Sequence, residues 1–424
     1  MKKSLILLCA ALTAACAGGP QDGPTLSGLN RSDFQSEADG KKTDLFVLKN
    51  DNGMEVCVTN FGGRIVSVMV PGRDGVMRDV VLGFDKVADY QTVPSDFGAT
   101  IGRYANRIAQ GRITLDGTEY QLPQNNYGHC LHGGPRGFQY RVFDAVQKSD
   151  RELELTYASK DGEEGFPGNF ECRVTMTLTD DNAIDIRYAA ETDKTTVVNM
   201  TNHSYFNLDG DPAKDNSEWL LTVNADSYTP VDSTFMTTGE IAPVEGTPMD
   251  FRTPTPVGER IDRDFEQLRN GHGIDHNWVL NTRGDIAEAC ASLESPATGI
   301  RLDVYTTDAY TKVIVEAVEE LKPEVLLFGA SNIGRDLAPR CAARLHTGLC
   351  ADCTHLDIDM PNYKNFLKEA STLPAERIEK LGTVMINREP HPVDRDLKMT
   401  RPAFGGHLMA SIICPRFRPA MATV

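Results

Sequence analysis

The sequence predicts a mainly β protein: a large antiparallel β-sandwich followed by a partial α/β domain with a parallel sheet. Residues 44–307 consist of short runs that alternate apolar and polar residues, with turn signals at short intervals. From residue 308 the apolar residues recur at helical spacing, and a continuous apolar run follows at 325–328. A chain of 424 residues is long enough for two or three domains. We therefore expect two different domains that meet near Asp308.

The N-terminus has the pattern of an export signal. Residues 1–17 carry two lysines, an apolar run and small residues, and they are too short to span a membrane. Cys16 among small residues suits the acylated cysteine of a bacterial lipoprotein, and simple cleavage near Ala17 is the alternative. Residues 18–43 are predicted to be a polar tether. The expected location is the periplasm or, with a lipid anchor, the cell envelope.

Charge and cysteine usage restrict the class of protein. The net charge of −17 argues against a nucleic-acid-binding surface and favours a neutral small-molecule ligand. The sequence has ten cysteines, and two of them lie in the export signal. Four more are spread singly through strand-like segments, where a buried thiol is more common than a disulfide: Cys57, Cys130, Cys172 and Cys290.

The β region begins with two predicted hairpins. Alternating runs flank Asn52–Gly53 in "LFVLKNDNGMEVCV", and the same device recurs at Asp116–Gly117 in "RITLDGTEYQL". Further strand-like segments are "RELELTYAS", "FECRVTMTLTDDNAIDIRYAAET" and "SEWLLTVNADSYTP". About 260 residues of this pattern favour one large sandwich.

Polar residues that are costly to bury cluster in four motifs. Asn106 and Arg107 lie in "IGRYANRIAQGRI", His132 in "NYGHCLHGGPRGF", His203 in "VNMTNHSYFNLDG" and Asp275 in "GHGIDHNWVL". The glycines after His132 suggest a close backbone approach to a ligand. Taken singly, a histidine on a strand is more often structural than catalytic, and an arginine can belong to a weak surface ion pair. No compact HxH or HExxH spacing is present, so no metal site is predicted.

Taken together, the motifs resemble a known family. The segments "GRYANRIAQG", "LHGGPRGF", "DGEEGFPGN", "TNHSYFNLDG", "GEIAPVEGTPMDFR" and "IDHNWVL" follow the order seen in aldose 1-epimerases, the galactose mutarotase family, over residues 44–307. The resemblance implies a mutarotase-like sandwich that interconverts the α and β anomers of a hexose such as galactose or glucose. The sugar ring opens at C1 and recloses, which requires one proton on the ring oxygen and one off the C1 hydroxyl.

The resemblance also implies roles for individual residues. His203 matches the general acid, and histidine suits that role because its pKa lies near the working pH. His132 matches a supporting donor near the ring oxygen. Asn106, Arg107, His132 and Asp275 match the residues that hold the sugar hydroxyls. No cofactor and no metal are implied, because nothing is oxidised and no group is transferred.

The general base of the family is not found. It is a glutamate on a late strand beyond "TGIRLDVYTT", and this chain departs from the family at Asp308, so the sandwich is predicted to be C-terminally truncated. Glu316, Glu319 and Glu320 fall on a predicted helix and are expected to face solvent. We expect catalysis reduced by about 10²–10⁴-fold, with exposed sheet edges and core. A sugar-binding module without turnover is the alternative.

Residues 308–424 resemble the α subunit of electron transfer flavoprotein, which carries FAD and works with a β subunit. We expect a helix over 309–321, a strand at 325–328, a second helix with Ser331 or Asn332 as its N-cap, and a strand at 411–414. The domain with most FAD contacts would follow residue 424, so FAD and the β subunit are expected only of a complete fragment. An incomplete electron carrier is therefore a second functional alternative.

Two details of this half have simple interpretations. "GASNIG" reads as a turn between a strand and a helix rather than a phosphate loop. Cys350 and Cys353 form a CxxC flanked by His346 and His355, but a second such pair is absent, so neither metal nor redox function is predicted. Export also disagrees with intracellular electron transfer. The sequence therefore favours a chimeric chain, from gene fusion or assembly error, over a bifunctional enzyme.

Overall fold

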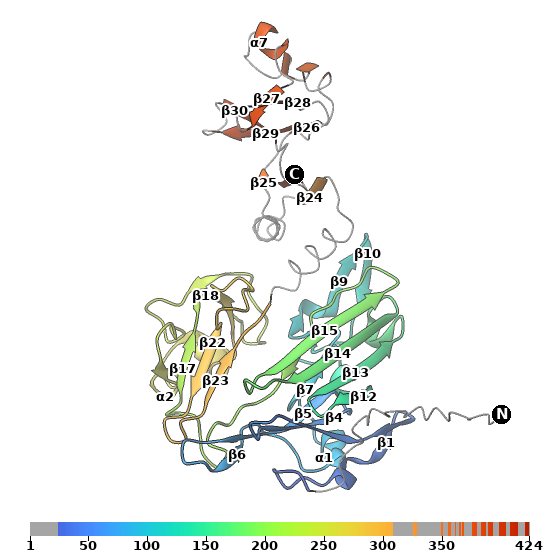
Figure 1. Ribbon diagram of the computed structural model, residues 1–424, viewed down its shortest axis with the longest axis vertical. Coiled ribbons are helices and arrows are strands. Elements are labelled where there is room, and N and C mark those ends of the chain that lie inside the picture. The colour runs from blue at the N-terminus through green and yellow to red at the C-terminus, as the bar shows by residue number, and fades with distance from the viewer. Residues whose placement is uncertain are drawn as a thin grey trace, which may run out of the picture. The chain divides into compact units, whose positions relative to one another are not determined.

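The computed structural model describes residues 24–307 continuously and only short segments beyond them (Figure 1). The described residues divide into two compact units. The first takes in the residues up to Asn281 together with Ala289–Val304, and the second takes in Thr282–Glu288 and the residues from Tyr305 on. The later described segments are 325–328, 349–350, 355–357, 375–379, 383–386, 389–392, 398–403, 408–413 and 420–423, with helical residues at 361, 364–365 and 367–368.

The first unit is built from antiparallel sheets. Two four-stranded sheets contain β3 (Leu45–Lys49), β4 (Glu55–Thr59), β5 (Arg64–Pro71) and β6 (Met77–Asp79), and β12 (Asp144–Ser149), β13 (Glu152–Ser159), β14 (Phe170–Leu178) and β15 (Ile184–Thr192). A third runs in the order β20 (Thr255–Pro256), β17 (Leu220–Val223), β22 (Ala291–Glu294) and β23 (Arg301–Val304). A three-stranded sheet runs β19 (Ala242–Pro243), β18 (Ala225–Thr229) and β21 (Asn277–Leu280). This architecture confirms the mainly β prediction.

Short ladders and helices connect these sheets. The two-stranded ladders are β1 (Ser36–Ala38) with β2 (Lys41–Thr43), β7 (Ala99–Ile101) with β16 (Thr201–His203), β8 (Arg107–Ile108) with β11 (Cys130–Leu131), and β9 (Arg112–Leu115) with β10 (Thr118–Gln121). The helices are α1 (Val87–Thr92), α2 (Gly258–Ile261), α3 (Glu266–Asn270) and the 3₁₀ turns η1 (Arg31–Phe34), η2 (Ala109–Gly111), η3 (Phe138–Tyr140) and η4 (Glu163–Gly165).

Both predicted hairpins form. Asn52 and Gly53 lie between β3 and β4, which pair in antiparallel register. Asp116 and Gly117 join β9 to β10 with φ values of 49° and 77°. Two successive positive φ values are what a tight turn between twisted strands requires, which explains the Asp-Gly sequence there.

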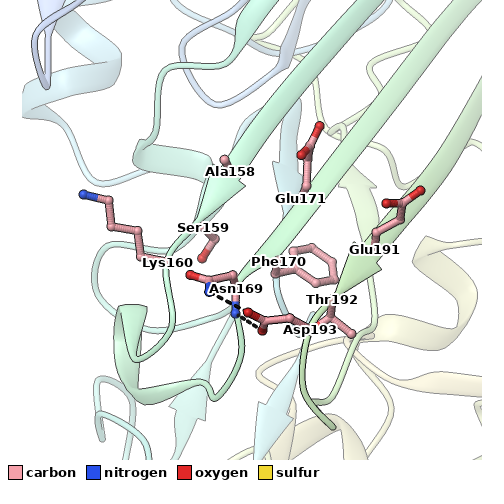
Figure 2. Close-up of a pocket in the computed structure, with 9 residues that line it drawn as sticks. All are labelled: Ala158, Ser159, Lys160, Asn169, Phe170, Glu171, Glu191, Thr192 and Asp193. Carbon is pink, nitrogen blue, oxygen red and sulfur yellow. Dashed lines mark hydrogen bonds between the residues drawn. The ribbon is translucent and has the colours of Figure 1, made fainter.

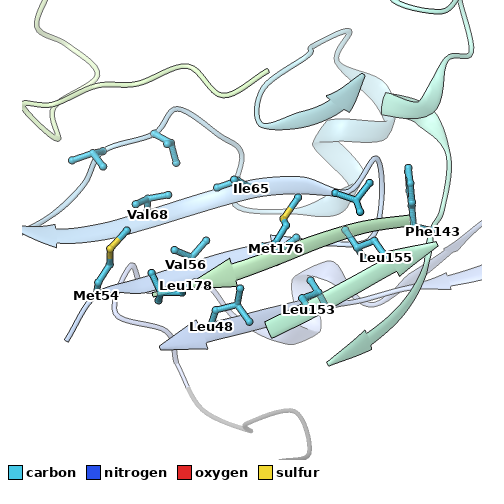
Figure 3. Close-up of a cluster of buried hydrophobic side chains, with 14 of the residues drawn as sticks. Leu48, Met54, Val56, Ile65, Val68, Phe143, Leu153, Leu155, Met176 and Leu178 are labelled. Carbon is cyan, nitrogen blue, oxygen red and sulfur yellow. The ribbon is translucent and has the colours of Figure 1, made fainter. Parts of the chain in front are cut away.

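The core lies between the sheet of β4 and β5 and the sheet of β13 and β14 (Figure 3). On β14, Phe170, Cys172, Val174, Met176 and Leu178 are buried while Glu171 and Arg173 are exposed, so side chains alternate between core and solvent. Figure 3 shows the buried side chains of the two sheets facing one another, Val56, Ile65 and Val68 on one side and Leu153, Leu155, Met176 and Leu178 on the other. This packing makes the two sheets one sandwich.

The single cysteines of the β region are core residues. Cys57, Cys130, Cys172 and Cys290 are all buried, and none of the four forms a disulfide. Burial raises the thiol pKa of Cys130 and of Cys172 to about 12, so both stay protonated at neutral pH. The prediction of buried thiols is confirmed for these four.

Residues 24–43 differ from the expected polar tether. They form η1 and the β1–β2 hairpin, and they bury Leu29 and Phe34 in a cluster with Leu45, Phe61 and Tyr90. The polar composition of the segment did not predict this docking, because two buried apolar side chains are enough to hold a short segment against the core.

Two of the edge strands in the described part of the chain are β15 and β23. Among the strands of residues 24–307, β15 pairs only with β14 and β23 only with β22. Val304 at the end of β23 is 40% exposed and the adjacent Tyr305 is 53% exposed. Unpaired backbone beside exposed apolar side chains favours strand-to-strand association.

The second unit has a mixed sheet content. β24 (Val325–Phe328), β31 (Ala420–Thr423) and β25 (Leu349–Cys350) form a parallel sheet, which confirms the strand at 325–328. However, β26 (His355–Asp357), β29 (Lys398–Ala403) and β30 (Leu408–Ile413) pair antiparallel, as do β27 (Thr383–Ile386) and β28 (Glu389–Pro392). The predicted strand at 411–414 therefore lies largely in an antiparallel pair. One short helix, α7 (Ala375–Glu379), is also described.

Several predictions fall outside the described residues. They concern the export signal, the helix at 309–321, its glutamates, the cap at Ser331 or Asn332, the second cysteine of the CxxC motif, Cys353, and its flanking residue His346. Within the described residues, no helix combines the length and apolar character needed to cross a membrane.

Candidate active site

Two short ladders bring the polar motifs together. β16 pairs with β7, so that His203 lies opposite Ala99, and β11 pairs with β8, so that Leu131 lies opposite Arg107. The two ladders are connected because the Ala105 N–H donates to the carbonyl of Asn199. Four segments that are distant in the sequence thus meet at one place in the first unit.

His132 and Asn106 hold each other by reciprocal backbone contacts. The Asn106 N–H donates to Nδ1 of His132 at 3.0 Å, and the His132 N–H donates to the Asn106 carbonyl at 3.0 Å. Because Nδ1 accepts, the neutral imidazole carries its proton on Nε2. Burial lowers the pKa of His132 to about 4, so the ring is a neutral N–H donor at neutral pH.

The first glycine after His132 allows two backbone segments to approach closely. A Cβ atom on Gly133 would lie 2.0 Å from the carbonyl oxygen of Gly102, and Gly133 has a φ of 80°. Only glycine fits this close approach of two backbones. This contact within the chain fixes the His132 loop.

His203 lies between two rings. Its ring centroid is 5.1 Å from that of His132, with the rings nearly perpendicular, and 5.1 Å from that of Tyr205, on which it stacks. Tyr205 in turn makes an edge contact with Phe97 at 4.9 Å. The His203 imidazole is half-buried and held beside His132.

Arg107 and Asp275 complete the cluster. Arg107 donates from Nε to Oδ1 of Asn126 at 3.1 Å, and its guanidinium lies 4.9 Å from the ring centroid of Phe235. Burial lowers the pKa of Arg107, and the negative charge of Asp275 opposes that shift. The same carboxylate acts on the pKa of His132. All five residues predicted from the sequence therefore lie in one cluster.

Asp96 is a member of the cluster that the sequence did not reveal. One oxygen of its carboxylate and one ring nitrogen each of His132 and His203 all lie within 4.8 Å of one another. Asp96 precedes β7 in a loop without periodicity or motif, so no local signal marks it. Its position depends on long-range contacts of the neighbouring backbone.

An aromatic rim was also missed. Phe235, whose φ of 62° is unusual for a non-glycine residue, stacks on His272 with ring centroids 5.5 Å apart and contacts Tyr127 at 5.7 Å. Tyr127 is largely exposed. Aromatic faces beside hydroxyl-binding polar groups suit the apolar faces of a sugar ring.

The carboxylates beside the histidines are Asp96 and Asp275. Both act on the pKa of His132, and no glutamate is among the main charges that do so. Among the described residues, the carboxylates with the largest effect on the pKa of His132 are therefore two aspartates.

The hollow in Figure 2 is a different place. This depression of about 400 Å³ lies at the ends of β13, β14 and β15 and is lined by Ser159, Asn169, Glu171, Glu191 and Asp193, among others. Figure 2 shows Asn169 bound to Asp193, with both bonds 2.7 Å long, while the two glutamates point away from them. None of the five predicted site residues lines it, so it is not the candidate active site.

Comparison with known proteins gives two family matches. Residues 44–326 match the family described as aldose 1-epimerase, and residues 297–386 match the electron transfer flavoprotein domain. The two matches overlap around the predicted junction at Asp308. The second match supports the resemblance of the C-terminal region.

Individual relatives agree with the first match. The galactose mutarotase of Rattus norvegicus is 42% identical over 268 residues, which is 63% of this chain and 76% of that protein. The aldose 1-epimerase of Escherichia coli K12 is 40% identical over 269 residues, covering 63% and 77% respectively.

Solved structures agree as well. An aldose epimerase homologue from C. elegans has a TM-score of 0.57 at 30% identity, covering 62% of this chain and 78% of that chain. The galactose 1-epimerase of Lactobacillus acidophilus has a TM-score of 0.56 at 31% identity, covering 61% and 75%. Sequence and fold therefore agree that this chain belongs, through residues 44–326, to the aldose 1-epimerase family.

Proposed function

We propose that the chain binds an aldohexose and interconverts its α and β anomers by acid–base ring opening, at a rate reduced by the loss of the family's catalytic glutamate. The observation that carries this proposal is the meeting of His132 and His203, with ring centroids 5.1 Å apart, in one cluster with Arg107 and Asp275. Family membership supports the reaction class.

His203 is the proposed general acid. In this role it gives a proton to the ring oxygen as the bond to C1 breaks. His132 is neutral and donates from Nε2, which suits a hydrogen bond to the ring oxygen or a neighbouring hydroxyl. Stacking on Tyr205 limits the rotation of the His203 ring and so keeps its proton aimed.

Asn106, Arg107 and Asp275 are the proposed sugar-holding groups. A guanidinium offers up to five donors, a carboxylate only acceptors and an amide both, so the three complement a set of hydroxyls that donate and accept. These contacts fix the sugar ring so that its ring oxygen is oriented toward the general acid.

The missing group is the base that takes the proton from the C1 hydroxyl. Asp96 and Asp275 lie beside the histidines, and we assign neither to that role. Ring opening without an oriented base is expected to be about 10²–10⁴-fold slower than in a complete enzyme.

Galactose binding and turnover, measured separately, test the proposal. We expect calorimetry to detect galactose binding to the full chain and NMR exchange spectroscopy to detect slow anomer interconversion above the buffer rate. The Asp275→Asn variant should bind galactose at least tenfold more weakly, because a sugar hydroxyl loses its charged acceptor. Binding without any interconversion would select the sugar-binding module, and no binding at all would overturn the proposal.

The reaction requires no cofactor. Proton transfer alone needs none, so we propose none, and treatment with a chelator should not lower the rate.

The N-terminal pattern supports a location outside the cytoplasm. We propose export to the periplasm or the cell envelope, which mass spectrometry of the mature N-terminus would test. An electron-carrier role would give the purified protein the yellow absorbance of flavin, and we propose that it has none.

A further inference from the structure

Asp96 is a charged member of the cluster to which the proposed reaction gives no role. One of its carboxylate oxygens lies within 4.8 Å of a ring nitrogen of His132 and of a ring nitrogen of His203. Among residues 24–307, no side chain or backbone N–H donates a hydrogen bond to this carboxylate. Asp96 is half-buried, so both of its carboxylate oxygens are available to accept from a ligand in the cluster.

We propose that Asp96 accepts a hydrogen bond from the exocyclic 6-hydroxyl of the bound aldohexose. The site then prefers hexoses that carry this hydroxyl over 6-deoxyhexoses and pentoses. The inference rests on the proposed function, since it concerns the sugar of that reaction. It assigns Asp96 to binding and specificity and not to proton transfer.

The two histidines mark the place of the ring oxygen. In the proposed reaction His203 gives its proton to that oxygen, and His132 donates to the same oxygen or to a neighbouring hydroxyl. Because Nδ1 of His132 already accepts from the Asn106 N–H, its Nε2 carries the proton and is the donor. A carboxylate beside these ring nitrogens therefore lies beside the ring oxygen of the sugar.

Two hydroxyls flank the ring oxygen of a hexopyranose. One is the C1 hydroxyl, and the other is the 6-hydroxyl, which is joined to the ring oxygen through C5 and C6. The C1 hydroxyl loses its proton to a base across the breaking bond from the acid. Asp96 lies on the side of the acid, next to both histidines, so its position suits the 6-hydroxyl.

Asp96 and Asp275 act on the same side chains of the cluster. Burial raises the pKa of Tyr205, and the charges of Asp96 and Asp275 raise it further. Burial lowers the pKa of His132 to about 4, and both carboxylates oppose that shift, Asp96 more than Asp275. Two separate segments thus supply two charged acceptors to one site, which suits the recognition of two different hydroxyls.

The backbone around Asp96 is held from the core. The fully buried Arg64 donates to the carbonyl of Ser95 at 3.0 Å and to that of Phe97 at 2.8 Å, the residues on either side of Asp96. The Asp96 carbonyl also accepts from the Ala99 N–H at 3.0 Å. These bonds use backbone atoms of the loop, so they do not occupy the Asp96 carboxylate.

The same loop is tied to the strand of the proposed acid. The Gly98 N–H donates to the His203 carbonyl at 3.1 Å, and the Asn202 side chain donates to the Gly98 carbonyl at 2.8 Å. A Cβ atom on Gly98 would lie 1.9 Å from the carbonyl oxygen of Ile65, so the loop also packs directly on β5. Asp96 and His203 therefore share one rigid frame, which lowers the entropy lost when a sugar binds both.

Recognition of this kind rejects a sugar that lacks the hydroxyl. A site built to bond a hydroxyl discriminates against the analogue without it, because its polar group is then left unpaired. A hydrogen bond to a charged group contributes about tenfold or more in affinity. We therefore expect the full chain to bind D-fucose, which is 6-deoxy-D-galactose, about tenfold more weakly than galactose.

The test is a cycle that removes the side chain and the hydroxyl separately and together. Calorimetry measures galactose and D-fucose binding to the unmodified full chain and to Asp96→Ala. The variant should bind galactose about tenfold more weakly but should change D-fucose affinity less than about twofold, because the partner of Asp96 is already absent from that sugar.

A second carboxylate and a second deoxy sugar provide the controls. Asp275→Ala should weaken galactose and D-fucose binding by the same factor, because its effect does not involve the 6-hydroxyl. With 2-deoxy-D-galactose, which keeps the 6-hydroxyl, Asp96→Ala should cost as much affinity as it does with galactose.

Each outcome decides one claim. Equal losses of galactose and D-fucose affinity in Asp96→Ala, or no loss of galactose affinity, overturn this inference and leave the proposed function intact. An unmodified chain that binds none of the three sugars overturns the proposed function, and this inference with it. Circular dichroism checks that each variant is folded. If Asp96→Ala is not, Asp96→Asn, which removes only the charge, takes its place in the same cycle.

Discussion

At the scale of single residues, chemistry in this protein depends on how the backbone fixes a ring. His132 has its tautomer set by the Asn106 N–H and its neutrality set by burial. Both residues sit at positive φ, 52° and 62°, conformations that side chains other than glycine seldom adopt. Such local strain is retained where surrounding contacts enforce it, and here it aims a donor into the cluster.

Replacing the proposed acid separates binding from turnover. In His203→Gln the glutamine keeps a hydrogen-bonding group but has no titratable proton, so galactose affinity should change less than tenfold. The interconversion rate should fall to that of the buffer, because general acid catalysis contributes typically about 10²–10⁴-fold. NMR exchange spectroscopy gives the rate and calorimetry the affinity. A variant that retains the unmodified rate would exclude His203 as the acid.

A second histidine links stability to pH. Burial lowers the pKa of His276, while the charge of Asp275 partly opposes the shift, and Nε2 of the ring lies 3.1 Å from Oε1 of Gln267. The folded-state pKa is below the unfolded value of about 6.5, so below that pH the unfolded state binds the additional proton. The contribution is complete above the unfolded pKa and is lost as pH falls from there toward the folded pKa.

His276→Gln should therefore flatten the decline of stability in mild acid. Glutamine preserves a polar contact with Gln267 and does not titrate. Urea unfolding at several pH values between about 5 and 8 gives the slope of unfolding free energy against pH for both proteins. Identical slopes would show that His276 does not contribute.

At the scale of elements, the sandwich follows from period-two patterning. The alternation on β14 and the Asp-Gly turn between β9 and β10 could be predicted from the sequence because each depends only on neighbouring residues. The place of Asp96 in the site could not be predicted, because its loop is positioned by Arg64, more than thirty residues earlier in the chain. The docking of Phe34 was missed for the same reason, since its partners lie beyond its own segment.

In the candidate site, too, residues in sequence motifs could be predicted and residues placed by long-range contacts could not. The five predicted residues were found through motifs, and the structure places them in one cluster without testing their roles. The aromatic rim around Phe235 belongs to a loop with no recognisable pattern, so its place beside Arg107 emerged only from the fold. The antiparallel pairing of β30 was likewise missed, because an apolar run specifies a strand but not its partner.

A core substitution measures how much the sandwich depends on the contact between its sheets. Leu155 on β13 is fully buried in the main core, so Leu155→Ala should lower the free energy of unfolding by about 2–5 kcal/mol. Val146 on β12 is half exposed, and Val146→Ala should cost less than about 0.5 kcal/mol. Urea denaturation compares them, and equal losses would contradict the described core.

At the scale of the whole molecule, two family matches overlap between residues 297 and 326. The first unit ends at Val304 on β23, whose outer side has no partner strand among the described residues. The chain thus keeps the acid side of the proposed reaction and an open sheet edge in the same domain. Val304 lies four residues before the predicted junction at Asp308.

The open edge predicts self-association. Val304→Lys places a charge on β23, which should reduce light scattering by the full chain, because a charged edge resists pairing with another strand. Val93→Lys is the control, since Val93 is 46% exposed but follows α1 and belongs to no strand. Equal effects of both substitutions would attribute any change to net charge instead of the edge.

The most direct test of the central claim compares rates of anomer interconversion. Polarimetry on the purified full chain and on the aldose 1-epimerase of Escherichia coli K12, which is 40% identical over the shared region, gives both under the same conditions. We predict detectable galactose binding with a rate about 10²–10⁴-fold lower than that of the complete enzyme. A rate within about tenfold of that enzyme would contradict the account, because catalysis would then not depend on the missing base.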